Sequence, residues 1–131
     1  MTQPNIEQLI LASLAASRRA YAPYSKFKVG AALLTASDEM FLGCNVENAS
    51  YGLTVCAERV AVTSAIAAGQ TEFLALAIAS QQAATPCGAC RQVLSEFTAD
   101  LRILLVDTGS EKLIREVFLK QLLPDSFRLL D

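Results

Sequence analysis

The feature that most constrains the fold is a nearly unbroken apolar run, Phe73 to Ser80, between two segments with helical patterns. A run of this length is typical of a strand that is covered on both faces. A second such run, Arg102 to Asp107, follows the next helical segment. Strands that alternate with helices need crossover connections, so the sequence predicts an α/β fold with a largely parallel sheet and helices on both faces.

The other expected elements fit this order. Apolar periodicity and helix-capping residues predict helices over three segments, 5–20, 57–68 and 88–97. Two strands, 28–35 and 40–46, flank a short turn and predict a hairpin that adds one antiparallel strand. The tail is expected to hold a short helix before Pro124.

Length and composition fit one domain over residues 1–131. A chain of 131 residues has room for one hydrophobic core. Hydrophobic residues make up 53% and charged residues 18% of the chain, which excludes disorder. The mean hydropathy of +0.36 is high for a soluble monomer and favours surface buried between subunits.

Charge and histidine content exclude several function classes. The chain has 11 basic and 13 acidic residues, a net charge of −2, and no basic stripe, so no nucleic-acid partner is expected. It contains no histidine, which excludes Ser-His-Asp and Cys-His catalysis and histidine-ligated zinc.

Apolar segments are too short for a membrane span, which needs roughly 18–20 residues, so no membrane partner is expected. The apolar stretch 9–16 follows Glu7 and precedes Arg18 and Arg19, the wrong polarity for a signal peptide. We therefore expect a cytoplasmic protein, in which cysteines are more often thiols or metal ligands than disulfides.

Two short strings carry the candidate chemistry, Cys56-Ala57-Glu58 and Pro86-Cys87-Gly88-Ala89-Cys90. Each opens a predicted helix, and the two helix starts are expected side by side at one sheet edge. Three thiols would then hold a tetrahedral Zn²⁺ and leave its fourth position open, as in catalytic sites. Glu58 is close enough to move protons without binding the metal. Arg59 is placed to donate hydrogen bonds to the sulfurs and withdraw negative charge.

Plainer interpretations exist for the same residues. Taken alone, the Cys87–Cys90 pair resembles a thioredoxin-type redox pair, but it leaves Cys56 and Glu58 unexplained. A structural zinc site would need a fourth ligand, for which Cys44 is the only candidate. Glu58 by itself is an ordinary first-turn glutamate that favours the helix dipole.

Six strings appear in order along most of the chain: Tyr21-Ala-Pro-Tyr-Ser-Lys-Phe27, Val29-Gly-Ala-Ala-Leu33, Gly43-Cys-Asn-Val-Glu-Asn-Ala-Ser-Tyr51, Cys56-Ala-Glu-Arg59, Pro86-Cys-Gly-Ala-Cys-Arg-Gln-Val93, and Leu122-Leu-Pro124 with Phe127. Together they resemble the small, homotetrameric, all-cysteine class of cytidine deaminases. The resemblance implies a three-layer α/β/α fold with a mixed five-stranded sheet that has one antiparallel strand. It also implies one Zn²⁺ per subunit and hydrolytic deamination of cytidine and deoxycytidine in pyrimidine salvage.

The same resemblance implies roles for single residues. The thiols of Cys56, Cys87 and Cys90 bind zinc, and Glu58 is the proton shuttle. The remaining assignments concern the pyrimidine nucleoside: Phe27 packs on the base, Asn45 and Glu47 bind the ribose hydroxyls, Val46, Ala57 and the Thr85 carbonyl add contacts, and Phe127 reaches a neighbouring subunit's pocket.

Other functions are weighed against this one. A related aminonucleoside, such as a nucleoside antibiotic, is the alternative substrate, although Asn45-Val46-Glu47 favours a plain ribose. The acidic balance of charge disfavours a polynucleotide substrate. A non-enzymatic zinc or redox module is disfavoured because such a site has no use for Glu58.

Overall fold

The structure of the protein, a computed structural model, describes residues 5–130. Its elements are α1 (Ile6–Ser17), β1 (Gly30–Thr35), β2 (Met40–Cys44), a 3-10 turn (Tyr51–Leu53), α2 (Ala57–Ala67), β3 (Phe73–Ser80), α3 (Gly88–Phe97), β4 (Arg102–Asp107), β5 (Lys112–Phe118) and α4 (Leu119–Leu122). None of the helices in this range combines the length and the hydropathy of a membrane span.

The five strands form one mixed sheet in the order β2-β1-β3-β4-β5. Only the β3–β4 pair is parallel, because β1 is antiparallel to β2 and β3, and β5 is antiparallel to β4. The mixed five-stranded sheet is confirmed, but the expectation of a largely parallel sheet with one antiparallel strand is wrong. The strands β2, β3 and β4 do share a direction, as their connecting helices require. The hairpin strand β1, however, is inserted between β2 and β3.

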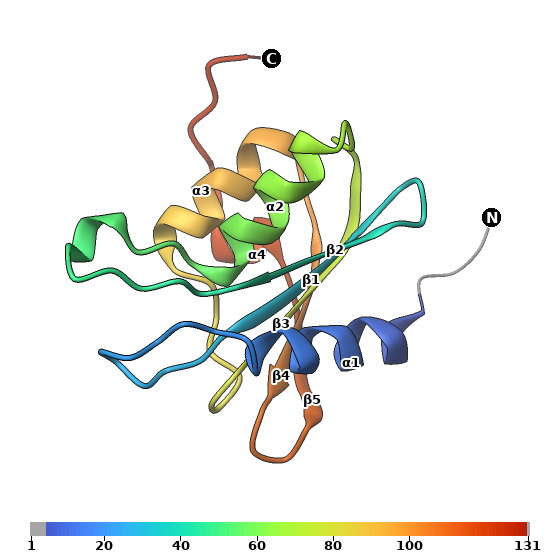
Figure 1. Ribbon diagram of the computed structural model, residues 1–131. Helices are drawn as coiled ribbons and strands as arrows, with labels where there is room; N and C mark the ends of the chain where they lie inside the picture. Colours follow the sequence, from blue (N-terminus) through green and yellow to red (C-terminus); the bar gives the residue numbers. More distant parts are fainter. Residues whose placement is uncertain (1–4, 131) are drawn as a thin grey trace.

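Helices cover both faces of this sheet, which confirms the three expected layers (Figure 1). The helix α1 lies on one face, and α2 and α3 lie on the other. Alternate residues of β1 point into the two layers. Ala31 and Leu33 join the core beneath α2 and α3, whereas Ala32 and Leu34 pack with Leu9 of α1.

The bounds of β3, α3 and β4 are those predicted from the sequence. The helix α1 ends three residues early because the next segment pairs elsewhere: the Tyr21 N–H donates to the Asn45 carbonyl (2.9 Å), and the Glu47 N–H donates to the Tyr21 carbonyl (2.9 Å). The sequence does not locate β5, since this edge strand exposes all of its residues but Val117 and shows no clean alternation.

Two glycines set how closely the long helices approach the sheet. A Cβ atom on Gly30 would lie 2.1 Å from the Ser13 carbonyl oxygen of α1. A Cβ atom on Gly43 would lie 2.2 Å from the Ala57 carbonyl oxygen of α2. Both distances are far inside van der Waals contact, so a larger residue would push the helix outward. Because Ala57 is the first residue of α2, Gly43 fixes the start of that helix.

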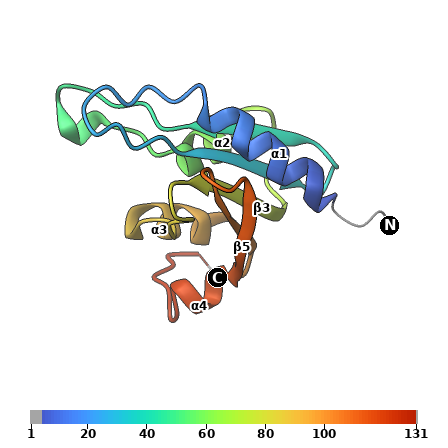
Figure 2. The same cartoon turned by 90° about the horizontal axis from the view of Figure 1, so that it is seen from below.

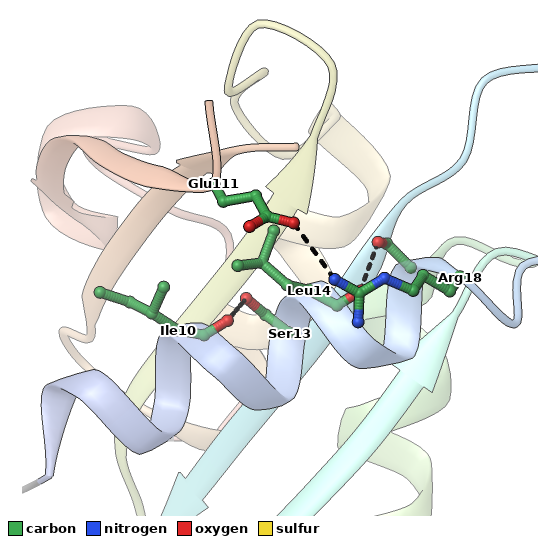
Figure 3. Close-up of polar contacts among 6 residues, drawn as sticks. Ile10, Ser13, Leu14, Arg18 and Glu111 are labelled. Carbon is green, nitrogen blue, oxygen red and sulfur yellow. Dashed lines mark hydrogen bonds and ion pairs between the residues drawn. The ribbon is translucent and has the colours of Figure 1, made fainter. Parts of the chain in front are cut away.

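Figure 3 shows polar contacts within the second half of α1 and at its C-terminal end. The Arg18 guanidinium lies 3.3 Å from the Glu111 carboxylate in the turn between β4 and β5. Within the helix, the Ser13 hydroxyl donates to the Ile10 carbonyl (2.7 Å). Both partners of the ion pair are well exposed, so apolar packing rather than this pair stabilises α1 on the sheet.

Candidate functional site

Three cysteine thiols meet where α2 and α3 begin. Cys56 and Cys87 are the N-cap residues of the two helices, and Cys90 lies in the first turn of α3. The Sγ atoms of Cys56 and Cys87 are 3.9 Å apart, and those of Cys87 and Cys90 are 3.5 Å apart. A tetrahedral Zn²⁺ with Zn–S bonds of about 2.3 Å separates its sulfurs by roughly 3.8 Å. The three thiols therefore fit this ion as predicted.

Cys44 lies outside this cluster. Among residues 5–130, the group of side chains close enough to share a metal ion consists of the other three cysteines. Cys44 instead lines a separate groove beside Leu42 and Val60. The fourth thiolate that a closed structural site would require is therefore not at the cluster.

The cluster concentrates negative charge on one sulfur. Hydrogen bonding by Cys90, with further bonds from Arg59 and Cys87, lowers the pKa of the Cys56 thiol to about 5 against the opposing effect of burial. The pKa of the Cys90 thiol is raised, first by its hydrogen bond to Cys56 and then by burial. Ligation of a metal by all three sulfurs must therefore release the Cys90 proton.

Arg59 approaches the cluster as the sequence predicts. Its Nη2 atom lies 3.6 Å from the Cys56 Sγ atom and 3.4 Å from the Thr54 carbonyl oxygen. A guanidinium at this position donates to the sulfur and offsets part of the charge that three thiolates bring.

A pocket of about 190 Å³ opens beside the thiols. Glu58 lines it and is only 5% exposed. Burial is the main cause that raises the pKa of the Glu58 carboxyl group above its ordinary value. A carboxyl group with a raised pKa next to three thiols that can bind a metal ion is suited to accept and return protons near neutral pH.

Four of the predicted substrate residues line this pocket: Phe27, Asn45, Ala57 and Thr85. Asn45 also fixes the backbone beside Phe27, because its Nδ2 donates to the Phe27 carbonyl (2.8 Å) and its Oδ1 accepts from the Val29 N–H (2.9 Å). The side chain of Asn45 is thus held by the segment before β1 that presents Phe27.

Glu47 lies in a neighbouring hollow of about 370 Å³, which shares Thr54 with the pocket. Its carboxylate accepts the Ser25 hydroxyl and the backbone N–H groups of Tyr24 (3.0 Å) and Ser25 (3.1 Å). These bonds, the Ser25 hydroxyl above all, lower the pKa of the Glu47 carboxyl group. Glu47 therefore stays ionised, and its hydrogen bonds hold the loop that contains Tyr24 and Ser25 next to the site.

The structure does not bring Val46 and Phe127 to the pocket. Val46 is 43% exposed, and its backbone exchanges hydrogen bonds with Val55. Phe127 is 68% exposed in the tail, where its carbonyl accepts from the Gln92 side chain (3.2 Å).

Several pocket residues are not identified by the sequence analysis: Val29, Thr54, Ile78, Ser80 and Ala84. Ser80 carries a usable signal, since it is the polar last residue of a buried apolar strand. Its hydroxyl accepts from the Ala84 N–H (2.9 Å) and so shapes the loop that follows β3.

Comparison with known proteins places this geometry in context. Residues 3–105 match the family model described as the cytidine and deoxycytidylate deaminase zinc-binding region. The cytidine deaminase of Sporosarcina psychrophila is 42% identical over 126 residues, which cover 94% of this chain and 91% of that protein. The crystal structure of cytidine deaminase from Burkholderia pseudomallei gives a TM-score of 0.87 at 48% identity, covering 97% of this chain and 100% of that one. The blasticidin-S deaminase of Bacillus cereus is 30% identical over 110 residues, 76% of each chain.

Proposed function

The chain belongs to the cytidine and deoxycytidylate deaminase family, and we propose that its whole length forms one domain that hydrolyses the C4 amino group of cytidine and deoxycytidine. The products are uridine or deoxyuridine and ammonia. The observation that carries this proposal is the set of three thiols at two helix starts beside the buried carboxyl group of Glu58.

The lining of the site favours an uncharged nucleoside over its phosphate. Within the described residues, neither the pocket nor the neighbouring hollow is lined by lysine or arginine. The hollow instead presents the Glu47 carboxylate, which repels a phosphate group. The nearby cations Lys26 and Lys28 line a different cavity, beside Arg18 of α1.

The proposed roles in the reaction follow from position and charge. Zn²⁺ held by the three thiolates supplies Lewis-acid activation of water when it is bound. Glu58 accepts a proton from the attacking water and passes it to N3 of the ring. It then accepts the proton of the hydroxyl group formed at C4 and passes it to the amino group, so that a C4 carbonyl forms, the C4–N bond breaks and ammonia leaves. Arg59 lowers the negative charge on the sulfurs through its contact with Cys56.

Substrate positioning is assigned to the residues around the thiols. Phe27 packs on the pyrimidine, and the backbone of Ala57 and of Thr85 contacts the edge of the base. Asn45 and Glu47 bind the ribose hydroxyls, with the sugar extending from the pocket into the hollow next to it. Thr54 lines both the pocket and the hollow, so the two cavities are neighbours.

We also propose a homotetramer in which Phe127 reaches a neighbouring subunit's site. The accessible surface of the chain is 7517 Å², more than the roughly 6,700 Å² expected for a monomer of this mass. Large apolar side chains such as Tyr51, Leu53 and Phe127 are more than 60% exposed. Light scattering on the purified protein tests this assembly, and a fully active monomer would contradict it.

A cytoplasmic role in pyrimidine salvage completes the proposal. The cysteines of the described residues are all free thiols, and the three at the cluster must stay reduced to bind Zn²⁺. A reducing compartment meets that requirement.

The deciding experiment is the loss of ultraviolet absorbance on incubating the purified zinc protein with candidate substrates. Cytidine and deoxycytidine should be consumed, and a chelator should stop the reaction until zinc is restored. Deoxycytidine 5′-monophosphate should react far more slowly than deoxycytidine, given the anionic hollow. Blasticidin S is the second candidate because of the 30% identical relative. Consumption of blasticidin S with cytidine untouched would overturn the proposal.

A further inference from the structure

The loop between β3 and α3, residues 81–87, forms one wall of the pocket and leads directly into the ligand Cys87. Two residues at strand ends hold its first half. The Gln82 N–H donates to the carboxylate of Asp107, the last residue of β4 (2.9 Å), and the Ala84 N–H donates to the hydroxyl of Ser80, the last residue of β3 (2.9 Å). Gln82 and Ala83 have positive φ angles of 64° and 51°. A backbone in this conformation persists only where its surroundings hold it.

Arg91 holds the second half of the same loop. Its Nε donates to the Pro86 carbonyl (2.7 Å), and its Nη2 donates to the Thr85 hydroxyl (3.2 Å). Its Nη1 donates to the Leu122 carbonyl at the end of α4 (2.8 Å). One side chain thus joins the pocket wall to a helix that lies 31 residues further along the chain.

The far end of this link is fixed to the core. The helix α4 lies beside α3 (Figure 2), and its first residue, Leu119, is 2% exposed. The Leu119 N–H donates to the Leu101 carbonyl just before β4 (2.9 Å). The Leu122 carbonyl therefore offers Arg91 a rigid support rather than a mobile tail.

The geometry suits a guanidinium and no other side chain. Arginine presents its donors in a planar fork, which lets three nitrogens reach three acceptors at once. A lysine ammonium at the same position has one nitrogen, too small to span acceptors in two separate segments. The Arg91 guanidinium donates to the pocket wall and to α4, whereas that of Arg59 donates to the Cys56 sulfur, so the two arginines have different functions.

We propose that Arg91 is a positioning residue of the active site, which holds the Thr85–Pro86 wall against α4 at the distance from the thiols that the bound base requires. The consequence for kinetics rests on the proposed function. Because the wall contacts the substrate both before and during reaction, its loss weakens ground-state and transition-state binding alike. The KM should therefore rise while kcat stays nearly constant.

The test compares Arg91→Met with Arg102→Met and Arg91→Lys, each loaded with zinc. Arg102 is the control, since its guanidinium also joins two segments, here β4 and the Glu116 carboxylate of β5 (2.9 Å), but does not line the pocket. For Arg91→Met we expect KM for cytidine to rise roughly tenfold, the weight of one charge-assisted hydrogen bond, with kcat changed less than threefold. Arg91→Lys should resemble Arg91→Met, and Arg102→Met should keep the wild-type KM.

Amide hydrogen exchange gives a readout that needs no substrate. In Arg91→Met, exchange should accelerate in 82–87 and 119–123 and stay unchanged in 73–80 and in α2. Faster exchange everywhere would indicate general destabilisation and overturn the proposal, as would an unchanged segment 82–87 or a wild-type KM. If the wild-type protein deaminates no cytidine while the local exchange effect is found, the proposed function fails and the positioning role of Arg91 stands.

Discussion

On both faces of the sheet a glycine lets a helix pack closely against a strand, but only one of these close contacts lies at the candidate site. On each face a helix comes so close to a strand that only glycine fits, Gly30 beneath α1 and Gly43 beneath α2. The close approach of α1 involves Ser13 and Ser17 in its second half, and the end of that helix carries an exposed ion pair. The close approach of α2 involves Ala57, its first residue, which lies between Cys56 and Glu58. The distance between helix and strand therefore affects the positions of the site residues only on the α2 face, where the residue in close contact is the first residue of the helix.

The largest difference between the faces should appear when the metal ligands are removed. Cys56→Ser should lose zinc and reduce deamination to background, since three sulfurs are needed to hold the ion. Cys44→Ser, in strand β2, should keep one zinc per chain and full activity. Zinc analysis with the cytidine assay checks both. Zinc loss in Cys44→Ser together with zinc retention in Cys56→Ser would show that the ligands are wrongly assigned.

Glu58→Gln should come next, with zinc retained and kcat lowered by about 10²–10⁴-fold, the usual contribution of a general acid–base group. The chain offers a matched control on the other face, because Glu7 is the first-turn glutamate of α1 as Glu58 is of α2. Glu7→Gln should leave kcat within twofold of wild type. Near-normal turnover by Glu58→Gln would refute the proton-shuttle role.

Gly43→Ala and Gly30→Ala compare the two close approaches directly. Each should destabilise the protein by about 1–3 kcal/mol, because the added methyl group displaces a helix. Only Gly43→Ala should also weaken zinc binding and lower kcat/KM per bound zinc, since it moves the start of α2. Thermal unfolding and zinc titration measure the two effects separately. Equal losses of kcat/KM per bound zinc in both variants would contradict the claim that only the contact between Gly43 and α2 positions the site residues.

The smallest effect concerns pH. Hydrogen bonds from Ser25 lower the pKa of the Glu47 carboxyl group from its ordinary value of 4.5. The proposed contribution of ionised Glu47 to substrate binding should therefore be complete above pH 4.5 and be lost as the pH falls through the lowered pKa. In Ser25→Ala the loss should begin at higher pH, seen as a steeper lower part of the acid limb of kcat/KM, since protonation of Glu58, whose pKa is raised, already controls the upper part. Arg18→Gln, on the α1 face, should leave that limb in place. An identical acid limb in Ser25→Ala and wild type would contradict the role of Ser25.

The sequence by itself determined the chemical groups and most of the regular elements. The Cys56-Ala57-Glu58 and Cys87–Cys90 strings bring three thiols and the proposed proton carrier to helix starts through local geometry. The bounds of β3, α3 and β4 follow from apolar runs and helical spacing, which are properties of neighbouring residues. Family resemblance on the same strings supplied the proposed nucleoside contacts, of which Phe27, Asn45, Ala57 and Thr85 line the pocket.

Only the tertiary structure decided which distant segments meet. The insertion of β1 between β2 and β3 leaves one parallel pair, and no local pattern encodes strand order. The position of Glu47 in a hollow of its own depends on bonds to Ser25, which is 22 residues away in the chain. The link from Arg91 to the Leu122 carbonyl likewise spans 31 residues. Hydrogen-bond partners at such separations are chosen by packing, because the period of apolar residues fixes an element and a face but not its neighbour.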